Sequence, residues 1–284
     1  MMRPGVQAGA ETENADRKLR EAEHDRGLQQ VSATVVSAVR PSLSLLRIKA
    51  RLETDELAAE WSLPNVAFRI LLGSDQASRI YTVRRYDPET ALFDFDIVQH
   101  PHDSPMMEWG ASLKIGDSFT IVGPRQHLII PQANGRRVAL FLDASGIPAL
   151  FALMQQWPEG LAGEGWILTD DAAAFAELPA IPGLVLHRIG DRAGRSGSAL
   201  LERAEALHDP AAHILWGAGE RSEMRAIRQY FLSAGLEKRD VAVSGYWKRG
   251  VSNSEIDLRR RESYERLIAQ GGTLADFDDL AVEI

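Results

Sequence analysis

The feature that most constrains this chain is a change of hydrophobic pattern near Pro131. Before it, short apolar runs are punctuated by turn residues, as at Gly73-Ser74 and Asp87-Pro88. After it, apolar runs alternate with helical patterns. Many short strands at close spacing favour a closed antiparallel barrel, whereas alternating strands and helices favour a parallel sheet. The sequence therefore predicts two domains of different class, with the boundary at Pro131–Arg136.

The N-terminal half is predicted to be the antiparallel barrel. Phe93, Phe95 and Ile97 alternate with neighbours that include two aspartates, which is the period of a half-buried strand. A helix that begins near Pro105 and runs to Ile115 is expected to cover one mouth of the barrel. The expected strands are Val31–Val39, Leu43–Leu52, Ala67–Leu72, Arg79–Tyr86, Leu92–Gln99, Ser118–Val122 and His127–Ile130.

The C-terminal half is predicted to be an α/β domain. It opens with the continuous apolar run Val138–Leu142, which is typical of a parallel strand buried on both faces. Further expected strands are Trp166–Thr169, Leu184–His187, Ile214–Trp216 and Val241–Ser244, and expected helices are Ile147–Gln156, Ala199–Leu207, Glu220–Ala234 and Glu255–Gln270. The predicted division is a polar tail at 1–30, the barrel at 31–132, the α/β domain at 133–250, and a C-terminal helix and tail at 251–284.

Composition excludes several classes of function. The 32 Lys and Arg against 40 Asp and Glu give a net charge of −8, which argues against nucleic-acid binding. Because there is no Cys, thiolate zinc sites and Cys-ligated iron–sulfur clusters are excluded, and redox chemistry would need a bound organic cofactor or a metal site without Cys ligands. No apolar run approaches the ~18–20 residues of a membrane span, and no signal-peptide pattern follows the first residue. We therefore expect a cytoplasmic protein without a membrane span.

The segment from Arg79 to Arg84 carries the first chemical signal. Alternation along a strand places Arg79, Tyr81 and Val83 on one face and Thr82 and Arg84 on the other. A flavin needs a cation for its phosphates, a flat ring beside the isoalloxazine and a small polar donor near its redox nitrogen, and these residue types supply all three. The alternative is an ordinary strand with an exposed arginine and a core tyrosine.

A second signal is the loop that contains His100 and leads into the helix starting near Pro105. Backbone N–H groups at a helix N-terminus point at an anion, so this loop could hold a pyrophosphate. A metal site at His100 and His102 is disfavoured because no third ligand lies nearby.

Three segments in the C-terminal half could meet a ligand. Asp143–Ala149 and Trp216–Glu220 each join an apolar strand to a helix, where a nucleotide can bind and where small residues permit close approach. In Ser244–Gly250 an aromatic pair stands beside Lys248 and Arg249, which suits a large anionic or aromatic ligand. Plain structural turns are the alternative at all three places.

Taken in this order, these segments resemble the siderophore-interacting protein family, whose members are FAD-dependent ferric-siderophore reductases related to the ferredoxin reductases. The resemblance spans about Val31 to Gly250. It is carried by Arg79–Arg84, Val98–His100 with Pro105 and Trp109, Gly116-Asp117 with Gly123-Pro124, Asp143 with Pro148-Ala149, Trp216–Glu220 and Gly245–Gly250. The chain departs from the family at Ser104-Pro105-Met106-Met107, where a Gly-Pro-Ala-Ser run is usual.

The resemblance implies an antiparallel FAD-binding barrel followed by a parallel-sheet NAD(P)H-binding domain. In the barrel it implies that Arg79 contacts the FAD phosphate, Tyr81 flanks the isoalloxazine, Thr82 hydrogen-bonds near N5 and Val83 lines the ring through its backbone. The residues implied to surround the pyrophosphate and adenine are His100, Met106, Met107 and Trp109.

In the second domain the resemblance implies a nicotinamide-nucleotide face and a cationic patch. The face is assigned to Asp143, Ser145, Gly146, Gly217, Ala218, Gly219 and Glu220. The candidate cations for an anionic ferric siderophore are Arg69, Lys248 and Arg249.

The implied reaction is reduction of a ferric siderophore to release Fe(II), with electrons passing from NADPH or NADH through FAD. No residue is assigned to catalytic proton transfer, and a ferredoxin is left open as the electron donor. Two alternatives stay open. One is a flavin reductase for another acceptor, which needs no patch at Lys248 and Arg249. The other is a non-enzymatic siderophore-binding protein that has lost flavin through the altered loop at Ser104–Met107.

Overall fold

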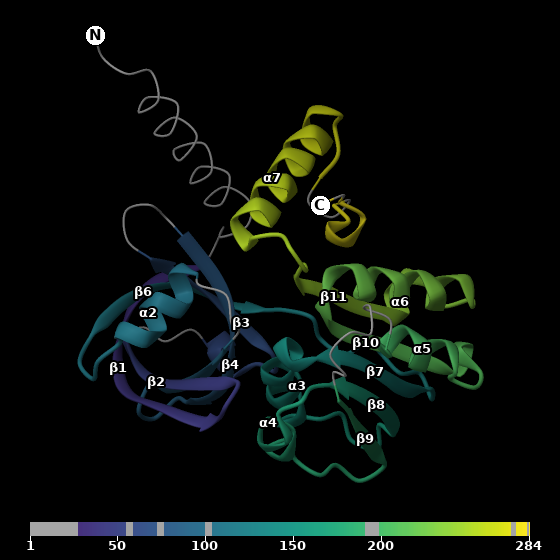
Figure 1. Cartoon of the computed structure of the whole chain (residues 1–284), viewed down its shortest axis with the longest axis horizontal. Helices are drawn as coiled ribbons and strands as arrows, with labels where there is room; N and C mark the ends of the chain where they lie inside the picture. Colours follow the sequence, from purple (N-terminus) through teal and green to yellow (C-terminus); the bar gives the residue numbers. More distant parts are fainter. Residues whose placement is uncertain are drawn as a thin grey trace.

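The structure, a computed structural model, describes residues 28–54, 59–72, 77–99, 104–190, 199–273, 277–282 and 284. Most of the predicted N-terminal tail and the predicted FAD contact His100 lie outside the described residues. The two predicted domains are both present, the barrel to the left and the sheet to the right in Figure 1.

The first domain is a closed six-stranded barrel in which neighbouring strands are antiparallel, in the order β1-β2-β5-β4-β3-β6. Its strands are β1 (Gln29–Ser42), β2 (Leu45–Glu53), β3 (Val66–Leu72), β4 (Ala77–Asp87), β5 (Leu92–Val98) and β6 (Ser118–Gln126). Alternate side chains point inward and form an aromatic core around Trp61, Phe68, Phe93 and Phe95. The helix α2 (Pro105–Ser112) packs against this core through Met106.

Two sequence predictions fail in the barrel. The expected strand His127–Ile130 is irregular because Leu128 has a φ of 49°, which ends an extended run, and its carbonyl instead accepts from Asn65 Nδ2 at 3.1 Å. The helix expected to reach Ile115 ends at Ser112, because Leu113 leaves the helical region with a ψ of 136° and Lys114 N donates to Asp117 Oδ2 at 2.8 Å.

The second domain is a five-stranded parallel sheet in the order β11-β10-β7-β8-β9. The strands are β7 (Arg137–Asp143), β8 (Gly163–Leu168), β9 (Leu184–Ile189), β10 (His213–Glu220) and β11 (Val241–Trp247). The helices are α3 (Ile147–Met154), α4 (Ala172–Ala176), α5 (Ala199–Glu205), α6 (Arg221–Ser233) and α7 (Asn253–Ala269). One sheet face packs on α3 and α4 and the other on α5 and α6, so the domain has three layers (Figure 1).

Several strands of this sheet run further than the sequence indicates, and two of them carry the glycine-containing motifs. The prediction ended one at Trp216, but β10 continues to Glu220 and pairs Gly217 with Phe141 of β7 and with Val243 of β11. Likewise β11 continues past Ser244 to Trp247. The segment Trp216–Glu220 therefore lies in a strand rather than in the expected turn, because β10 pairs on both sides and this outweighs the weak strand preference of glycine. In the second motif Ser244–Trp247 belongs to the edge strand β11, and the turn begins only after it.

The domains meet along the outer face of the barrel, where α3 and α4 lie against it (Figure 1). The predicted boundary at residues 132 and 133 falls between β6 and β7. Trp216 Nε1 donates to Leu128 O at 2.8 Å, and Gln156 Nε2 donates to Ser62 O at 2.8 Å. These bonds tie the irregular connection and the barrel to the sheet domain.

Candidate functional site

Strand β4 presents two different faces. Val83 points into the barrel core, and the Tyr81 ring packs against Phe95 and Phe68 with centroid distances of 5.6 and 6.4 Å. Arg84 points the other way, toward Phe151 and Glu177 of the second domain, and alternation places Thr82 on the same face as Arg84. This is the separation that the alternation predicts.

The β4 residues fit the needs of a bound flavin. Burial raises the pKa of the Tyr81 phenol, so the ring stays neutral at physiological pH. The half-buried Thr82 hydroxyl has no hydrogen-bond partner within the part of the chain that the structure describes, and so it is available to a ligand. Arg79 is half-buried, and its Nη1 donates to Ser78 O at 2.6 Å. A cation, a flat ring and an unpartnered hydroxyl therefore lie along one strand.

At the N-terminus of α2 the side chains face the barrel rather than a ligand. Ser104 caps the helix by accepting from Met107 N at 3.3 Å. Met106 is buried, and the Trp109 ring meets Phe119 edge-on at 5.3 Å. What this helix end can offer a phosphate is the backbone N–H of Met106 rather than its side chain, because Pro105 has no N–H and the N–H groups of Met107 and Glu108 donate to Ser104.

The Asp143 carboxylate accepts hydrogen bonds from three residues at the carboxyl edge of the sheet. Its Oδ1 accepts from Ser145 N at 2.8 Å and from Ser145 Oγ, while its Oδ2 accepts from Glu220 N and Trp247 Nε1, both at 2.8 Å. Asp143, Glu220 and Trp247 are the last residues of β7, β10 and β11. Burial raises the pKa of this carboxyl, and the hydrogen bonds from Ser145 and Trp247 oppose that rise. The carboxylate thus fastens three strand ends together.

The predicted nucleotide-binding glycines lie against the protein itself. A Cβ on Gly219 would stand 2.7 Å from Asp143 Oδ2, and one on Gly217 would stand 2.9 Å from Phe141 O. A Cβ on Gly146 would stand 2.8 Å from the carbonyl of Ala218. Close internal packing is therefore enough to require glycine at these positions, whatever ligand binds nearby.

The three candidate substrate cations come from different places. Arg69, on β3, donates from Nη1 to Ser78 Oγ at 3.0 Å. Lys248 Nζ donates to the terminal oxygen of Ile284, so the end of the chain covers it. Arg249 is exposed, and its backbone N–H donates to Glu220 Oε1 at 3.3 Å, while its guanidinium makes no hydrogen bond or ion pair with any described residue. Lys248 and Arg249 follow β11, at the same sheet edge as Asp143.

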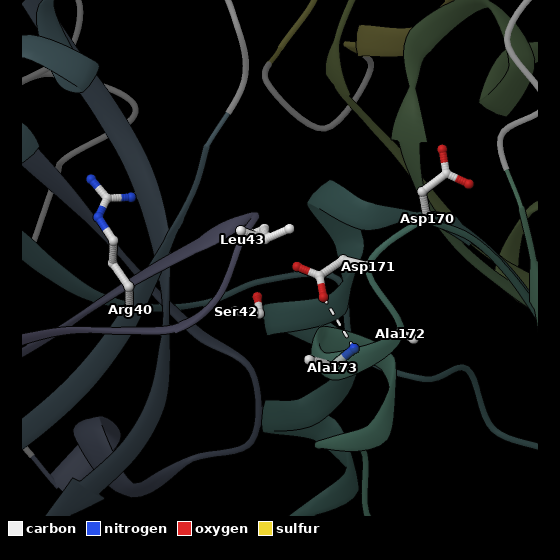
Figure 2. Close-up of a pocket in the computed structure, with 7 residues that line it drawn as sticks. All are labelled: Arg40, Ser42, Leu43, Asp170, Asp171, Ala172 and Ala173. Carbon is white, nitrogen blue, oxygen red and sulfur yellow. Dashed lines mark hydrogen bonds between the residues drawn. The ribbon is translucent and has the colours of Figure 1, made fainter.

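An open groove of about 720 Å³ lies between the end of β1 and the start of α4. Figure 2 shows its lining, which is Arg40, Ser42, Leu43, Asp170, Asp171, Ala172 and Ala173. None of the predicted site residues lines it. Among the described residues, no group of three His, Asp or Glu side chains gathers as a metal site, and no helix is long and apolar enough to cross a membrane.

This architecture, an antiparallel barrel followed by a parallel sheet, is of the ferredoxin-reductase type. Several of the predicted site residues lie at the carboxyl edge of the sheet. A ferredoxin reductase of carbazole 1,9a-dioxygenase shares this architecture, with a TM-score of 0.62 at 14% identity over 78% of this chain and 70% of that one. The family model for the siderophore-interacting FAD-binding domain matches residues 56–128, and that for siderophore-interacting protein matches residues 135–250.

Ferric acinetobactin reductase of Acinetobacter baumannii is 35% identical over 269 residues, covering 92% of this chain and 93% of that protein. The structure of a siderophore-interacting protein from the same organism superposes with a TM-score of 0.81 at 33% identity, covering 86% of this chain and all of the other. This chain belongs to the siderophore-interacting protein family, and the predictions of family and fold class are confirmed.

Proposed function

We propose that this protein reduces ferric siderophores with electrons that pass from NADPH or NADH through a bound FAD, and that it does so in the cytoplasm. The observation that carries the proposal is the strand β4, which aligns Arg79, Tyr81 and Thr82 in a domain matched by the family's FAD-binding model. The extent and identity of the match to ferric acinetobactin reductase support the same reaction class.

FAD supplies the ability to take two electrons together as hydride and to give them singly to iron. The protein's part is to bind and orient. In this proposal Arg79 would pair with a phosphate, Tyr81 would lie along the isoalloxazine and Thr82 would donate a hydrogen bond near N5. The Val83 side chain is buried, so Val83 contributes through its backbone. The Met106 N–H at the start of α2 would donate to the pyrophosphate, with Met107 and Trp109 beside it.

The carboxyl edge of the sheet is proposed to receive the nicotinamide nucleotide. Asp143 holds Ser145, Glu220 and Trp247 in register, and this fixes the backbone that a nucleotide would meet. Gly146, Gly217 and Gly219 have no side chain and the Ala218 methyl is buried, so none of these four residues would obstruct a nucleotide at this edge. Asp143 therefore shapes the nucleotide face rather than binding the nucleotide directly.

The siderophore is proposed to bind near Arg249, with Lys248 and Arg69 as further cations. Many ferric siderophores are anionic, and an exposed guanidinium attracts them without a desolvation cost. Fe(II) is held far more weakly than Fe(III) by hard-oxygen chelators, so reduction releases the metal. No side chain needs to act as an acid or base in this step.

The test is an anaerobic titration of the FAD-loaded protein. NADPH or NADH should bleach the flavin absorption, and a ferric siderophore should restore it while a ferrous chelator traps one Fe(II) per electron. Bleaching without recovery by any of a catecholate, hydroxamate or carboxylate ferric siderophore would indicate another acceptor. Bleaching only by a reduced ferredoxin would change the donor. A protein that binds ferric siderophore but never FAD would refute the reductase proposal.

A further inference from the structure

A cluster of four charged side chains, two buried and two half-buried, joins the two domains. Arg47 on β2 pairs bidentately with Asp96 on β5, with Nε–Oδ1 at 2.7 Å and Nη2–Oδ2 at 3.0 Å. Arg84 on β4 donates from Nη1 to the same Asp96 Oδ2 at 3.0 Å. These three residues belong to three adjacent barrel strands, so the barrel alone supplies two cations and one anion.

The missing anion comes from the other domain. Glu177, directly after α4, accepts from Arg47 Nη1 at 3.0 Å and from Arg84 Nη2 at 3.0 Å. The Arg84 guanidinium also lies 3.3 Å from the centroid of the Phe151 ring on α3. Among these residues, the second anion reaches Arg47 and Arg84 only when the second domain sits against the barrel, and Arg85, 5.3 Å from the Phe151 centroid, adds a further cation beside them. The hydrogen bond from Arg47 is the main reason that the pKa of Glu177 is lowered, which keeps it charged.

Burial of Arg84 and Asp96 leaves the charged groups of this cluster little freedom in their relative positions. The side chains of Arg84 and Asp96 are 4% and 0% exposed, so an unmatched charge there is costly. Bidentate pairs between guanidinium and carboxylate also fix direction as well as distance. A second fastening lies nearby: Ser44 N, on the β1–β2 hairpin, donates at 2.9 Å to Asp171, whose other oxygen caps α4 (Figure 2). Both ends of α4 are thereby tied to the barrel.

We propose that Glu177 is a positioning residue for hydride transfer: by closing the Arg47–Asp96–Arg84 cluster, it sets the nicotinamide domain at a fixed position over the flavin barrel. Arg84 lies two residues from Thr82 on the same face of β4. The residue that binds Glu177 is therefore next to the proposed flavin contact. The inference rests on the proposed function, because it concerns the distance between donor and flavin. Misplacement by about 1 Å can slow a reaction about 100-fold.

The variant that tests this is Glu177→Gln. It leaves Arg47 and Arg84 bonded to Asp96 within the barrel, so folding and FAD binding should persist. Glu255→Gln is the matched control, since Glu255 pairs with Arg259 on the exposed α7 with both side chains 48% exposed. In stopped flow, Glu177→Gln should slow flavin reduction by NADPH or NADH at least tenfold. Its affinity for the nucleotide and the reoxidation of dithionite-reduced flavin by ferric siderophore should stay within twofold of the original values.

Geometry is measured separately from activity. Because the chain has no Cys, nitroxide labels will attach only to cysteines that are introduced. We would introduce Glu89→Cys in the barrel and Glu205→Cys in the sheet domain and measure the distance between the two labels by pulsed electron paramagnetic resonance. A single narrow distance should broaden or shift in Glu177→Gln and remain unchanged in Glu255→Gln. An unaltered distance together with a reduction rate within twofold of the original would overturn the inference. If the unsubstituted protein shows no reduction by either nucleotide, the proposed function fails instead, and the distance still reports on the cluster.

Discussion

Replacing Asp143 tests the claim that one carboxylate organises the nucleotide-binding edge. In Asp143→Asn the amide can take two orientations. The one of lower energy keeps its oxygen toward Glu220 N and Trp247 Nε1, the two donors, and turns its NH₂ toward Ser145. The Ser145 hydroxyl can rotate to accept, but the Ser145 N–H then lacks an acceptor. One unmet buried donor costs about 1–3 kcal/mol. For a domain of this size that is a fall of roughly 3–10 °C in melting temperature.

Asp143→Ala is the second arm of the same prediction. It leaves the N–H groups of Ser145, Glu220 and Trp247 without their acceptor, so its loss should exceed that of Asp143→Asn by the cost of two further donors, about 2–6 kcal/mol. Thermal unfolding monitored by tryptophan fluorescence, to which Trp247 contributes, measures the loss of stability in both variants. Equal losses in the two variants, or an Asn variant that melts with the original protein, would refute the reasoning.

Three further predictions follow from other contacts. Gly219→Ala should lower the melting temperature because its Cβ would stand 2.7 Å from Asp143 Oδ2, whereas Gly190→Ala, where the nearest contact is 3.4 Å, should not. The Arg136 hydrogen bond lowers the pKa of Asp240 from 3.8 to about 2. The ionised Asp240 therefore stabilises the folded protein fully above pH 3.8, and this contribution is lost as the pH falls toward 2. The stability difference between the original protein and Asp240→Asn in urea should therefore shrink over that range; a constant difference would contradict it. Arg249→Glu should raise the KM for an anionic ferric siderophore severalfold and leave that for a neutral iron chelate unchanged in steady-state assays; equal effects on both would remove Arg249 from the substrate site.

The fold was largely predictable because burial imposes a period on the sequence. Phe93, Phe95 and Ile97 alternate as an inward-facing strand must, and Val138–Leu142 reads as a strand covered on both faces. The short helix α4 escaped notice because five residues, mostly alanine, carry almost no periodic signal. Its start was nonetheless marked by Asp171, a residue type that caps helices.

The site was less predictable because its contacts join distant parts of the chain. Alternation correctly placed Arg84 on the face opposite Tyr81, but its partner Glu177 is 93 residues away. Sequence reasoning assigned Asp143 and the glycines near it to a ligand, and the structure explains them first by contacts among three strand ends. Local spacing identifies which residues gather at a strand end, and only tertiary packing decides whether they face a ligand or one another.

The central claim is that this chain carries electrons from a nicotinamide nucleotide through FAD to siderophore-bound iron. The most direct measurement is the visible spectrum of the anaerobic, FAD-loaded protein through one full cycle. The account predicts that NADPH or NADH bleaches the flavin bands and that a ferric siderophore restores them with formation of Fe(II). A protein that retains no flavin after incubation with FAD, or a flavin that no donor reduces, would contradict it.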